Sequence, residues 1–501
     1  MKRLFRGLRK TPPRERYDAI VIGAGVGGLV CANLLARDGL SVLLVEQHYM
    51  VGGYCSTFKR AGFSFDAATH FYPLLGNPET ITGRLMAQIG ARSEWVLMDP
   101  VDTFHLPDGS RFEVPVDLDT YLARLKGEFP ASAGAIDAFF SAVRREYLAG
   151  LLRYFRGRES SSLAPDADLT LRQALDRHFD DHRLKLVLTA DCAHWGSPPD
   201  RTSFTFDSML RLSYFLGNYY PVGGSQAFVD DLARCFEASG GHILMSTRAE
   251  RVRIANGQVA GVELETTRGP LAGRHEIAAD VVVSNVDLLQ TVERLVGTRH
   301  FPTGYADDLR KLRVTYPCFL THIGLRDVSR QLLEEIQGYY WNSWNPDEVG
   351  RDGLRCKVFS PTLYEPRLAP EGSQIVILQK VVDIDYANID DWQAHKTEIQ
   401  EYVVDHLRSL VPGLDDKVVT LLSATAKTSH DFTLNHQGAM LGWEMSPDQL
   451  GPARPRTECG VGNLHFTGHW TRPGGGITPV MVSAMEVAQA ITGRSAATRS
   501  P

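Results

Sequence analysis

Three glycines and one acidic residue near the start of the chain have the types and the spacing needed to hold a dinucleotide. Gly23, Gly25 and Gly28 come first, and Glu46 follows 18 residues after the last of them. Gly23 allows a sharp turn, Gly25 lets the backbone approach a pyrophosphate, and Gly28 lets a helix pack closely on a sheet. The carboxylate of Glu46 can accept hydrogen bonds from the hydroxyls of an adenosine ribose. Since its charge would repel a 2′-phosphate, the pattern favours FAD or NAD over NADP.

The elements around these residues have the order that such a site needs. Tyr17–Val21 is a short apolar run that predicts a buried strand, and Leu29–Arg37 has apolar residues at helical spacing. Ser41–Val45 predicts a second buried strand that ends at Glu46. The phosphates of a dinucleotide would then face free backbone N–H groups at the positive end of the helix dipole. Strand, glycine turn, helix, strand and acid together are the context that this fingerprint requires.

The residues after Glu46 distinguish FAD from NAD. Glu46, five intervening residues and the pair Gly52-Gly53 resemble an extension found in the flavin-containing amine oxidase superfamily. In that superfamily the glycine pair closes over the pyrophosphate. The resemblance therefore implies FAD as the cofactor, with Gly52 and Gly53 in contact with it.

Within that superfamily the chain is most similar to the branch of phytoene desaturases, carotenoid isomerases and retinol saturases. The similarity lies in Gly53–Phe58, Gly62–Asp66 and the Y-P-x-G-G element within Asn218–Gly224. Amine oxidases proper usually carry an arginine soon after the glycine pair, where this chain has Tyr54 and Cys55. An amine oxidase is thus the poorer match.

Two further elements belong to the same resemblance. The hairpin signal Asn256-Gly257 follows a strand that ends near Val252, and in the family this strand lends backbone atoms to the adenine. Ala279–Asn285 resembles the sheet strand by which the chain returns to the nucleotide-binding domain.

A second glycine-rich loop lies near the C-terminus. Asn463–Gly468 predicts a strand ending in glycine, and Arg472–Ile477 predicts an exposed backbone loop. Thr478 is a good N-cap and Pro479 a good first residue for a helix over Val480–Ile491.

This region resembles the C-terminal flavin loop of the family. The resemblance implies contacts to the flavin from Gly468, Gly475, Gly476 and Ile477. A helix that points its N-terminus at the isoalloxazine would stabilise the negative charge of a reduced flavin. Where many relatives carry Asp or Glu after the first glycine, this chain has His469, and that contact stays open. No cysteine occurs between Gly460 and Ile477, so this loop offers no thioether and the FAD is expected to be non-covalent.

These motifs imply an α/β fold, with a Rossmann-like FAD-binding domain and a discontinuous mixed α+β substrate domain. The resemblance is specific over 17–66, 218–285 and 460–491, and weak between them. The expected divisions are a basic tail over 1–16, an FAD-binding domain over 17–75, 222–297 and 455–495, and a substrate domain over 76–221 and 298–454.

Both inserts are expected to combine helices with strands. The first predicts four helices and a hairpin over Thr103–Val114 that turns at Asp108-Gly109. Phe204–Tyr220 is rich in aromatic residues, which indicates either core packing or a wall for a long apolar ligand. The second insert predicts strands over Cys318–Leu325, Leu354–Ser360 and Gln374–Val381, and a helix over Trp392–Leu410.

Composition narrows the class of protein. The chain has 501 residues, 43% hydrophobic and 22% charged, which is typical of a globular protein. A net charge of −6 gives no reason to expect nucleic acid as a partner. Seven scattered cysteines without a C-x-x-C pair suggest reduced thiols in a cytoplasmic setting, and no metal site is expected. No apolar run is long enough to span a membrane, and no secretory signal is recognisable.

The N-terminus differs from the rest of the chain. Residues 1–16 contain seven basic side chains and one acidic one, a net charge of +6. Leu4, Phe5 and Leu8 would share one face of a short helix that ends before Pro12. Such a segment could contact an anionic membrane peripherally, or it could be a frayed charged end.

The leading functional hypothesis is an FAD-dependent oxidoreductase acting on a long apolar polyene, a carotenoid or a retinoid. Isomerisation, saturation and desaturation stay open, with a preference for isomerisation or saturation. A desaturase would pass electrons to a quinone or to oxygen, because a single glycine fingerprint leaves no separate NADPH domain. Hydride transfer at the flavin requires mainly positioning and exclusion of water, and no catalytic side chains are assigned.

Two alternatives stand beside this hypothesis. One is an amine or porphyrinogen oxidase of the same fold, which the residues after Gly53 disfavour. The other is a non-enzymatic isoprenoid-binding escort protein, a class that shares the fold without flavin. Glu46 and the loop Gly474–Gly476 argue against the escort protein.

Overall fold

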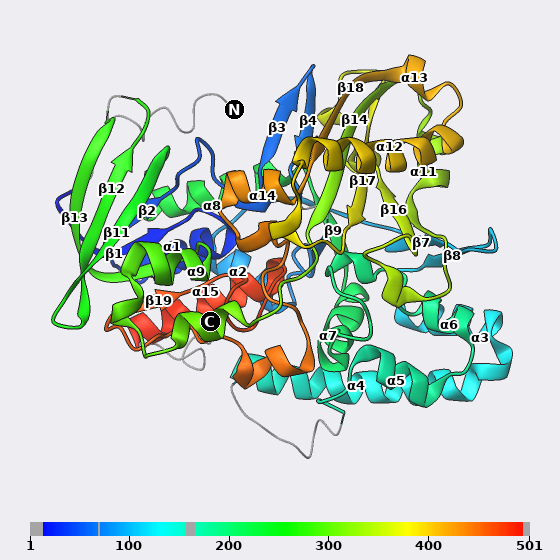
Figure 1. Ribbon diagram of the computed structural model, residues 1–501, viewed down its shortest axis with the longest axis horizontal. Helices are drawn as coiled ribbons and strands as arrows, with labels where there is room; N and C mark the ends of the chain where they lie inside the picture. The colour runs from blue at the N-terminus through cyan, green and yellow to red at the C-terminus, as the bar shows by residue number, and fades with distance from the viewer. Residues whose placement is uncertain (1–13, 69–70, 157–165, 270, 494–501) are drawn as a thin grey trace.

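The computed structural model describes residues 14–68, 71–156, 166–269 and 271–493. Two seven-stranded sheets lie at opposite ends of the molecule, on the left and the upper right of Figure 1. A set of helices, α3 to α7, lies below the right-hand sheet in the same view. The space between the sheets is where the functional site lies.

The first sheet has the strand order β10-β2-β1-β13-β12-β11, with β19 paired to β13. Strands β10, β2, β1, β13 and β19 run parallel, whereas β11, β12 and β13 form an antiparallel meander. The chain therefore returns to this sheet from three separate stretches of sequence. Its strands are β1 Arg16–Ile22, β2 Val42–Val45, β10 His242–Leu244, β11 Thr247–Ala255, β12 Gln258–Thr266, β13 Gly273–Ser284 and β19 Leu464–Phe466.

The helix after β1 is the centre of this half. All residues of α1 (Val26–Arg37) except Arg37 are buried, because the helix packs against the sheet and against two other helices, α8 (Ser225–Ala238) and α15 (Ile477–Thr492). A helix that is apolar all round is stable only in such an interior position. The strand, turn, helix and strand predicted over residues 17–45 are present.

The second sheet has the order β18-β14-β17-β16-β15-β7-β8 and is antiparallel except where β15 pairs with β7. Two of its strands come from the first insert and five from the second. They are β7 Asp102–His105, β8 Arg111–Val114, β14 Cys318–Arg326, β15 Gly338–Trp341, β16 Leu354–Phe359, β17 Ser373–Val381 and β18 Val418–Ala424.

The two faces of this sheet have different surroundings, as strand β14 shows. Phe319 and Ile323 pack in one apolar cluster with residues of α12 (Trp392–Leu410). Leu320 and His322, which alternate with them, face the interior of the molecule. Both faces are covered, which explains why β14 is buried along all but its last residue.

The remaining elements connect and cover the two sheets. Five short strands form a two-stranded and a three-stranded sheet, and the other helices surround the interior. The strands are β3 Thr57–Arg60, β4 Phe63–Asp66, β5 Tyr72–Pro73, β6 Trp95–Leu97 and β9 Asn218–Pro221. The helices are α2 Ile81–Ile89, α3 Leu118–Glu128, α4 Ala133–Arg156, α5 Leu171–His178, α6 His182–Val187, α7 Phe204–Tyr214, α9 Leu288–Gln290, α10 Tyr305–Arg310, α11 Arg330–Ile336, α13 Leu414–Lys417 and α14 Ala426–Thr433.

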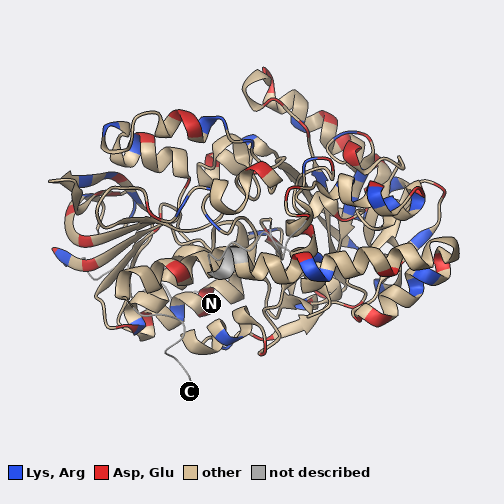
Figure 2. Cartoon of the chain, turned by 90° about the horizontal axis from the view of Figure 1, so that it is seen from below, with Lys and Arg blue, Asp and Glu red and all other residues tan. Residues whose placement is uncertain are grey.

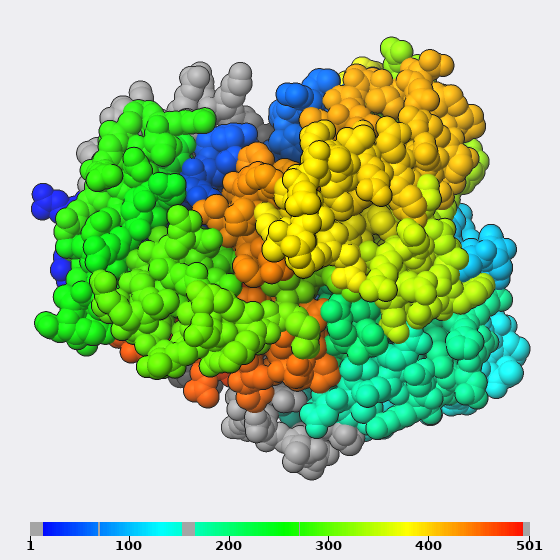
Figure 3. Space-filling view, in the orientation of Figure 1, coloured from blue at the N-terminus to red at the C-terminus, as the bar shows by residue number. Residues whose placement is uncertain are grey.

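Helix α14 and the residues after it lie between the two halves. In Figures 1 and 3 this orange segment runs through the middle of the molecule, with green parts of the first half on one side and yellow parts of the second on the other. Two contacts tie it to both halves. The hydroxyl of Tyr54 donates to the carbonyl of Ala439, and the N–H of Thr315 donates to the carbonyl of Gly442.

The structure corrects the predicted start of the helix that follows the C-terminal glycine loop. Helix α15 begins at Ile477, three residues before the predicted Val480, and its N-cap is Gly476 rather than Thr478. Gly476 has φ of 103°, a conformation that glycine adopts readily, so the chain enters the helix directly from the glycine loop. The hydroxyl of Thr478 instead donates to the carbonyl of Pro73.

The distribution of charged residues and the lengths of the helices both bear on which partners the protein could bind. Basic and acidic residues are interspersed along the helices in the view of Figure 2. None of the helices within the described residues combines the length and the apolar composition needed to cross a bilayer.

Candidate functional site

A single continuous cavity of about 1410 Å³ reaches from the glycine turn after β1 to the interior face of the second sheet. Typical ligand sites enclose roughly 300–1,000 Å³. The volume therefore leaves room for more than one bound molecule. Residues from both halves and from the segment around α14 line it.

The glycine turn forms one end of the cavity. Gly23 has φ of 94°, and Gly25 is the N-cap of α1 without a side-chain cap. Both residues line the cavity, so the N-terminal end of α1 opens into it. A Cβ atom on Gly28 would lie 2.0 Å from the carbonyl oxygen of Gly23. Gly28 lies outside the cavity and lets α1 pack against the turn, as its predicted role requires.

Glu46 lies at the end of β2 and also lines the cavity. Its Oε2 accepts a hydrogen bond from the N–H of Ala24 at 2.8 Å, and its Oε1 accepts one from the N–H of His48 at 2.8 Å. Burial raises the pKa of this carboxyl, whereas the two backbone donors lower it. The carboxylate is thus fixed beside the glycine turn, where a ribose of a dinucleotide would lie.

The glycine pair after Glu46 returns to the same turn. The N–H of Gly52 donates to the carbonyl of Ala24, and Gly52 forms an isolated bridge with Gly25. A Cβ atom on Gly53 would lie 3.5 Å from the Cα of Gly25. Side chains at these positions would fill the space over the turn, so the residues present fit a pyrophosphate held against backbone.

Val252 does not lie in the cavity. Its side chain is buried within the first sheet, and the residues of β11 that line the cavity are Thr247, Arg248, Ala249 and Glu250. The pairing of β11 with β12 shifts register between Ala249 and Arg251. Such a bulge turns the beginning of the strand away from its end. Sequence pattern does not reveal a bulge of this kind, so the cavity-lining part of β11 was missed.

The C-terminal glycine loop forms a second wall. Gly468, Gly475, Gly476 and Ile477 all line the cavity, as does the first turn of α15. A Cβ atom on Gly475 would lie 2.3 Å from the carbonyl oxygen of Leu441. The loop therefore packs backbone against backbone, and it presents the N-terminal end of a 16-residue helix to the cavity.

His469 directly follows Gly468 and lines the cavity beside the C-terminal glycine loop. Burial and the charge of Arg454 lower the pKa of its imidazole to about 3, so the ring is neutral at physiological pH. Its Nε2 has no hydrogen-bond partner among the described residues, and the ring lies 6.5 Å from that of Tyr54 in a stacked arrangement. Both residues line the cavity. A neutral group thus lies beside the glycine loop.

Buried Arg454 supports the glycine loop from behind. Its guanidinium donates to the backbone carbonyls of Trp443 at 3.1 Å, Glu444 at 3.1 Å and His469 at 2.9 Å. A Cβ atom on Gly474 would lie 3.4 Å from its guanidinium carbon. The loop and the segment around residues 443–445 are therefore held together.

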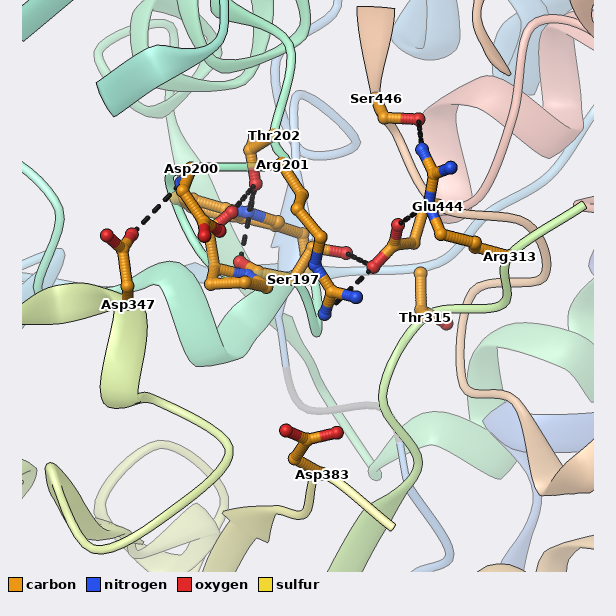
Figure 4. Close-up of polar contacts among 12 residues, drawn as sticks. Ser197, Asp200, Arg201, Thr202, Arg313, Thr315, Asp347, Asp383, Glu444 and Ser446 are labelled. Carbon is orange, nitrogen blue, oxygen red and sulfur yellow. Dashed lines mark hydrogen bonds and ion pairs between the residues drawn. The ribbon is translucent and has the colours of Figure 1, made fainter. Parts of the chain in front are cut away.

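The carboxylate of Glu444 anchors that segment to the second half (Figure 4). Its oxygens lie 3.1 Å from the guanidinium of Arg201 and 2.9 Å from Nε of Arg313. Burial raises the pKa of Glu444, and the two arginines lower it. The cluster is a long-range contact between three parts of the chain, and no local motif indicated it.

The interior face of the second sheet forms the far wall. Apolar Leu320, Leu422 and Ala424 line it, together with His322 and Gln379. The ring of His322 packs against Phe58 and Phe65, its Nε2 lies 3.0 Å from the carbonyl of Asp66, and burial lowers its pKa to about 4. This wall therefore carries no charged side chain from β14 or β18.

Helix α7 provides a third, apolar wall. Phe206, Met209 and Leu210 line the cavity, whereas Phe204 and Tyr214 are buried in the core. The aromatic stretch thus contributes both to the core and to the lining of the cavity. At the rim, Ile81 and Leu216 are 37% and 43% exposed.

No metal site or disulfide is present within these ranges of described residues. No group of three or more His, Cys, Asp or Glu side chains could hold a metal ion there. All seven cysteines are buried, and none of them forms a disulfide bond.

Comparison with known proteins gives a family match over most of the chain. The profile of the flavin-containing amine oxidoreductases matches residues 26–492. The chain is 26% identical to a lycopene-forming phytoene desaturase of Pseudescherichia vulneris, covering 94% of this chain and 98% of that protein. It is 26% identical to chloroplastic prolycopene isomerase 1 of an Oncidium hybrid cultivar, over 96% and 85% of the two chains. Identity to the all-trans-retinol 13,14-reductase of Danio rerio is 23%, over 93% and 84%.

Solved structures share the fold. An oxidoreductase from Methanosarcina mazei superposes with a TM-score of 0.67 at 18% identity, covering 94% of this chain and 99% of that one. A putrescine oxidase bound to putrescine gives a TM-score of 0.67 at 16% identity, over 96% and 100%. The predicted α/β fold of a flavin-dependent oxidoreductase is confirmed.

Proposed function

The chain belongs to the family of flavin-containing amine oxidoreductases, and we propose that it uses non-covalent FAD to act on a long apolar polyene, a carotenoid or a retinoid. One observation carries the proposal. The cavity that begins at a dinucleotide-type glycine turn continues, without interruption, to apolar walls on the second sheet and on α7.

FAD is the flavin that fits the first end of the cavity. Glu46, fixed by two backbone donors, would hold the ribose of an adenosine, which FMN lacks. Gly25, Gly52 and Gly53 leave backbone open to a pyrophosphate. Gly475 and Gly476 would place the N-terminus of α15 near the isoalloxazine. When bound there, FAD would supply the acceptor or donor of a hydride.

A polyene fits the rest of the cavity. Leu320, Leu422, Phe206 and Leu210 offer apolar surface, and burial of a hydrocarbon chain is favourable by about 25 cal/mol per Å². Three similar proteins have names that refer to carotenoids or retinoids: the phytoene desaturase, the prolycopene isomerase and the retinol reductase. These walls would orient the chain and exclude water while the flavin reacts.

Isomerisation or saturation is the preferred reaction, and desaturation with a quinone or oxygen as acceptor is the second candidate. The preference rests on Gly53–Phe58 and Asn218–Gly224, which resemble the isomerases and saturases slightly more than the bacterial desaturases. The chain has one glycine fingerprint, so any reductant would have to reach the flavin by another route than a second nucleotide domain.

A peripheral contact with an anionic membrane is part of the proposal. Residues 1–13 lie outside the described part, and they carry five basic side chains and no acidic one. Arg14 and Arg16 do not belong to the tail. Arg16 begins β1 and pairs with Asp280, and the N–H of Arg14 donates to Tyr17. The exposed apolar side chains at the cavity rim would suit entry of a substrate from a bilayer.

Pigment analysis would test the substrate class. The chain is expressed in a carotenoid-producing host beside a Gly25→Val variant, and the carotenoids of the two cultures are compared by chromatography. The proposal predicts a changed pattern of double bonds only with the native chain. Identical pigments in both cultures, with flavin bound to the native protein, would exclude the carotenoids tested.

A further inference from the structure

The side chain of Asn435 connects the two glycine-rich loops that line the dinucleotide end of the cavity. Asn435 lies just after α14, is 6% exposed and lines the cavity. Its Oδ1 accepts a hydrogen bond from the indole N–H of Trp470 at 3.0 Å, and its Nδ2 donates one to the hydroxyl of Tyr54 at 3.2 Å. Tyr54 follows the pair Gly52-Gly53, and Trp470 lies two residues after Gly468. One amide therefore joins both loops.

The direction of each of these hydrogen bonds is determined by its donor. An indole N–H can only donate, so the amide oxygen of Asn435 must face Trp470 and the amide nitrogen must face Tyr54. The hydroxyl of Tyr54 accepts from that nitrogen and donates its own proton to the carbonyl of Ala439 at 3.1 Å. A reversed amide would place two donors against each other at Trp470. The connection thus has one orientation.

The backbone around Asn435 is held as well. Its N–H donates to Oγ1 of Thr433 at 3.2 Å, and its carbonyl oxygen lies 2.9 Å from Nδ1 of His430. Leu434, directly before it, has φ of 59°, a left-handed conformation that is uncommon for leucine. Such a conformation persists only where the surrounding structure determines it. The turn is therefore fixed in the form that directs the amide of Asn435 between the two loops.

Both loops belong to the end of the cavity where we place the flavin. We propose, on the basis of the function proposed above, that Asn435 is a positioning residue that holds the loop of Tyr54 and the loop of Trp470 at the separation that the isoalloxazine requires. Hydrogen bonds that share one amide form a connected network, so the loss of one member weakens the connection between both loops. Without the amide, each loop moves separately, and the flavin is held less tightly and in a less defined orientation.

A double-mutant cycle tests whether the two loops are coupled. Tyr54→Phe removes one hydroxyl and Trp470→Phe removes one N–H, and both variants keep an aromatic ring. The Kd for FAD is measured by titrating the apoprotein of the native chain, of each single variant and of the double variant. Tyr340→Phe is the matched control, because the hydroxyl of Tyr340 also donates to a backbone carbonyl, that of Ile336, but outside the cavity.

Each single substitution at Tyr54 or Trp470 should raise the Kd about tenfold, the effect of losing one intramolecular hydrogen bond in a largely buried site. The control should bind FAD as the native chain does. Because either substitution breaks the same connection, the double variant should lose far less than the roughly hundredfold that independent effects would give. Losses that multiply, or an unchanged Kd in both single variants, would overturn the proposal.

Asn435→Leu separates positioning from a purely structural role. The visible circular dichroism of bound flavin reports the surroundings and orientation of the ring. It should change in Asn435→Leu and stay native in Tyr340→Phe, and adding Tyr54→Phe to Asn435→Leu should not weaken FAD binding further. A lower melting temperature with a native Kd and a native dichroism spectrum would overturn the positioning role.

The Tyr54 and Trp470 variants decide the outcome if Asn435→Leu does not fold. They also separate this inference from the proposed function. Native protein that binds FAD, with losses that multiply in the cycle, removes the role of Asn435 and leaves the flavin-dependent function standing. Native protein that binds no FAD removes both.

Discussion

The carboxylate of Glu46 is hydrogen-bonded to the N–H of Ala24 at 2.8 Å, although the two residues are 22 positions apart in the chain. The acid at the end of β2 thus holds the glycine turn at the end of β1. Because a second N–H, that of His48, fixes its other oxygen, the carboxylate needs no rearrangement to meet a ligand at the turn. The turn and the acid form one preorganised unit.

Replacement of Glu46 should weaken FAD binding. Glu46→Ala removes a charged acceptor that we place against the ribose, so the loss should be about 1–3 kcal/mol, typical of a hydrogen bond to a charged group. The Kd is measured by titrating apoprotein with FAD. Glu79→Ala, at the exposed rim of the same cavity, is the control and should bind FAD as the native chain does. An unchanged Kd in Glu46→Ala would exclude the ribose contact.

Substitutions at two glycines of the turn should have different effects, one on flavin binding and the other on folding. A Cβ atom on Gly25 would meet only the side-chain amide of Asn285, at 3.1 Å, so Gly25→Val should fold but purify without flavin. A Cβ atom on Gly28 would overlap a backbone oxygen, so Gly28→Ala should lower the melting temperature sharply or prevent folding. Flavin absorbance and thermal unfolding are measured on both. Full flavin content in folded Gly25→Val would contradict the placement of the pyrophosphate.

Asp191, a half-buried acid in the segment between α6 and α7, should make stability depend on pH. Desolvation and the charges of Asp207 and Asp102 raise the pKa of Asp191 to about 7, although Arg211 opposes this shift. The native state then holds the proton more tightly than the unfolded chain, whose pKa is near 4. The contribution of this group to stability is therefore largest below pH 4 and is lost as the pH rises through 7.

Asp191→Asn should remove that dependence. The variant should be more stable than the native chain at pH 8, and the difference should shrink toward pH 5 in urea titrations. Asp207→Asn is the control, because Asp207 pairs with Arg211 and its loss would leave a buried cation. That variant should be destabilised across the whole range. Parallel pH profiles for Asp191→Asn and the native chain would show that Asp191 is ionised throughout.

Removal of residues 1–13 should reduce binding to anionic vesicles. Each basic residue near such a surface contributes about 1 kcal/mol, and the attraction falls as salt screens exposed charge. Sedimentation with vesicles that contain phosphatidylserine is compared for the full and the shortened chain at low and high salt. Flavin content should be equal in both. Equal sedimentation at low salt would assign any membrane contact to another part of the molecule.

The local sequence pattern predicted the elements of the half built on the first sheet well. The run from β1 through α1 to β2 is specified by buried apolar strands, turn glycines and helical spacing, all within thirty residues. The hairpin of β11 and β12 at Asn256-Gly257 was predicted for the same reason. Asn256 has φ of 52° and Gly257 has φ of 77°, which is the conformation that this pair favours.

Features that depend on distant residues could not be predicted. The sequence did not predict strands β15 and β18. Strand β15 has only four residues and strand β18 is half-exposed, so both give weak hydrophobic patterns. The clusters of Glu444 with Arg201 and Arg313, and of Lys357 with Asp102, join parts of the chain more than a hundred residues apart.

The most direct test of the proposed function is an anaerobic assay of the purified flavoprotein with a poly-cis carotene. The substrate is incubated with oxidised flavin, with oxidised flavin and a quinone, and with chemically reduced flavin, and the products are separated by chromatography. We predict isomerised or saturated product only with reduced flavin. New double bonds with oxidised flavin and quinone would contradict the preferred reaction and establish desaturation, and an unchanged carotene under all three conditions would contradict its use as a substrate.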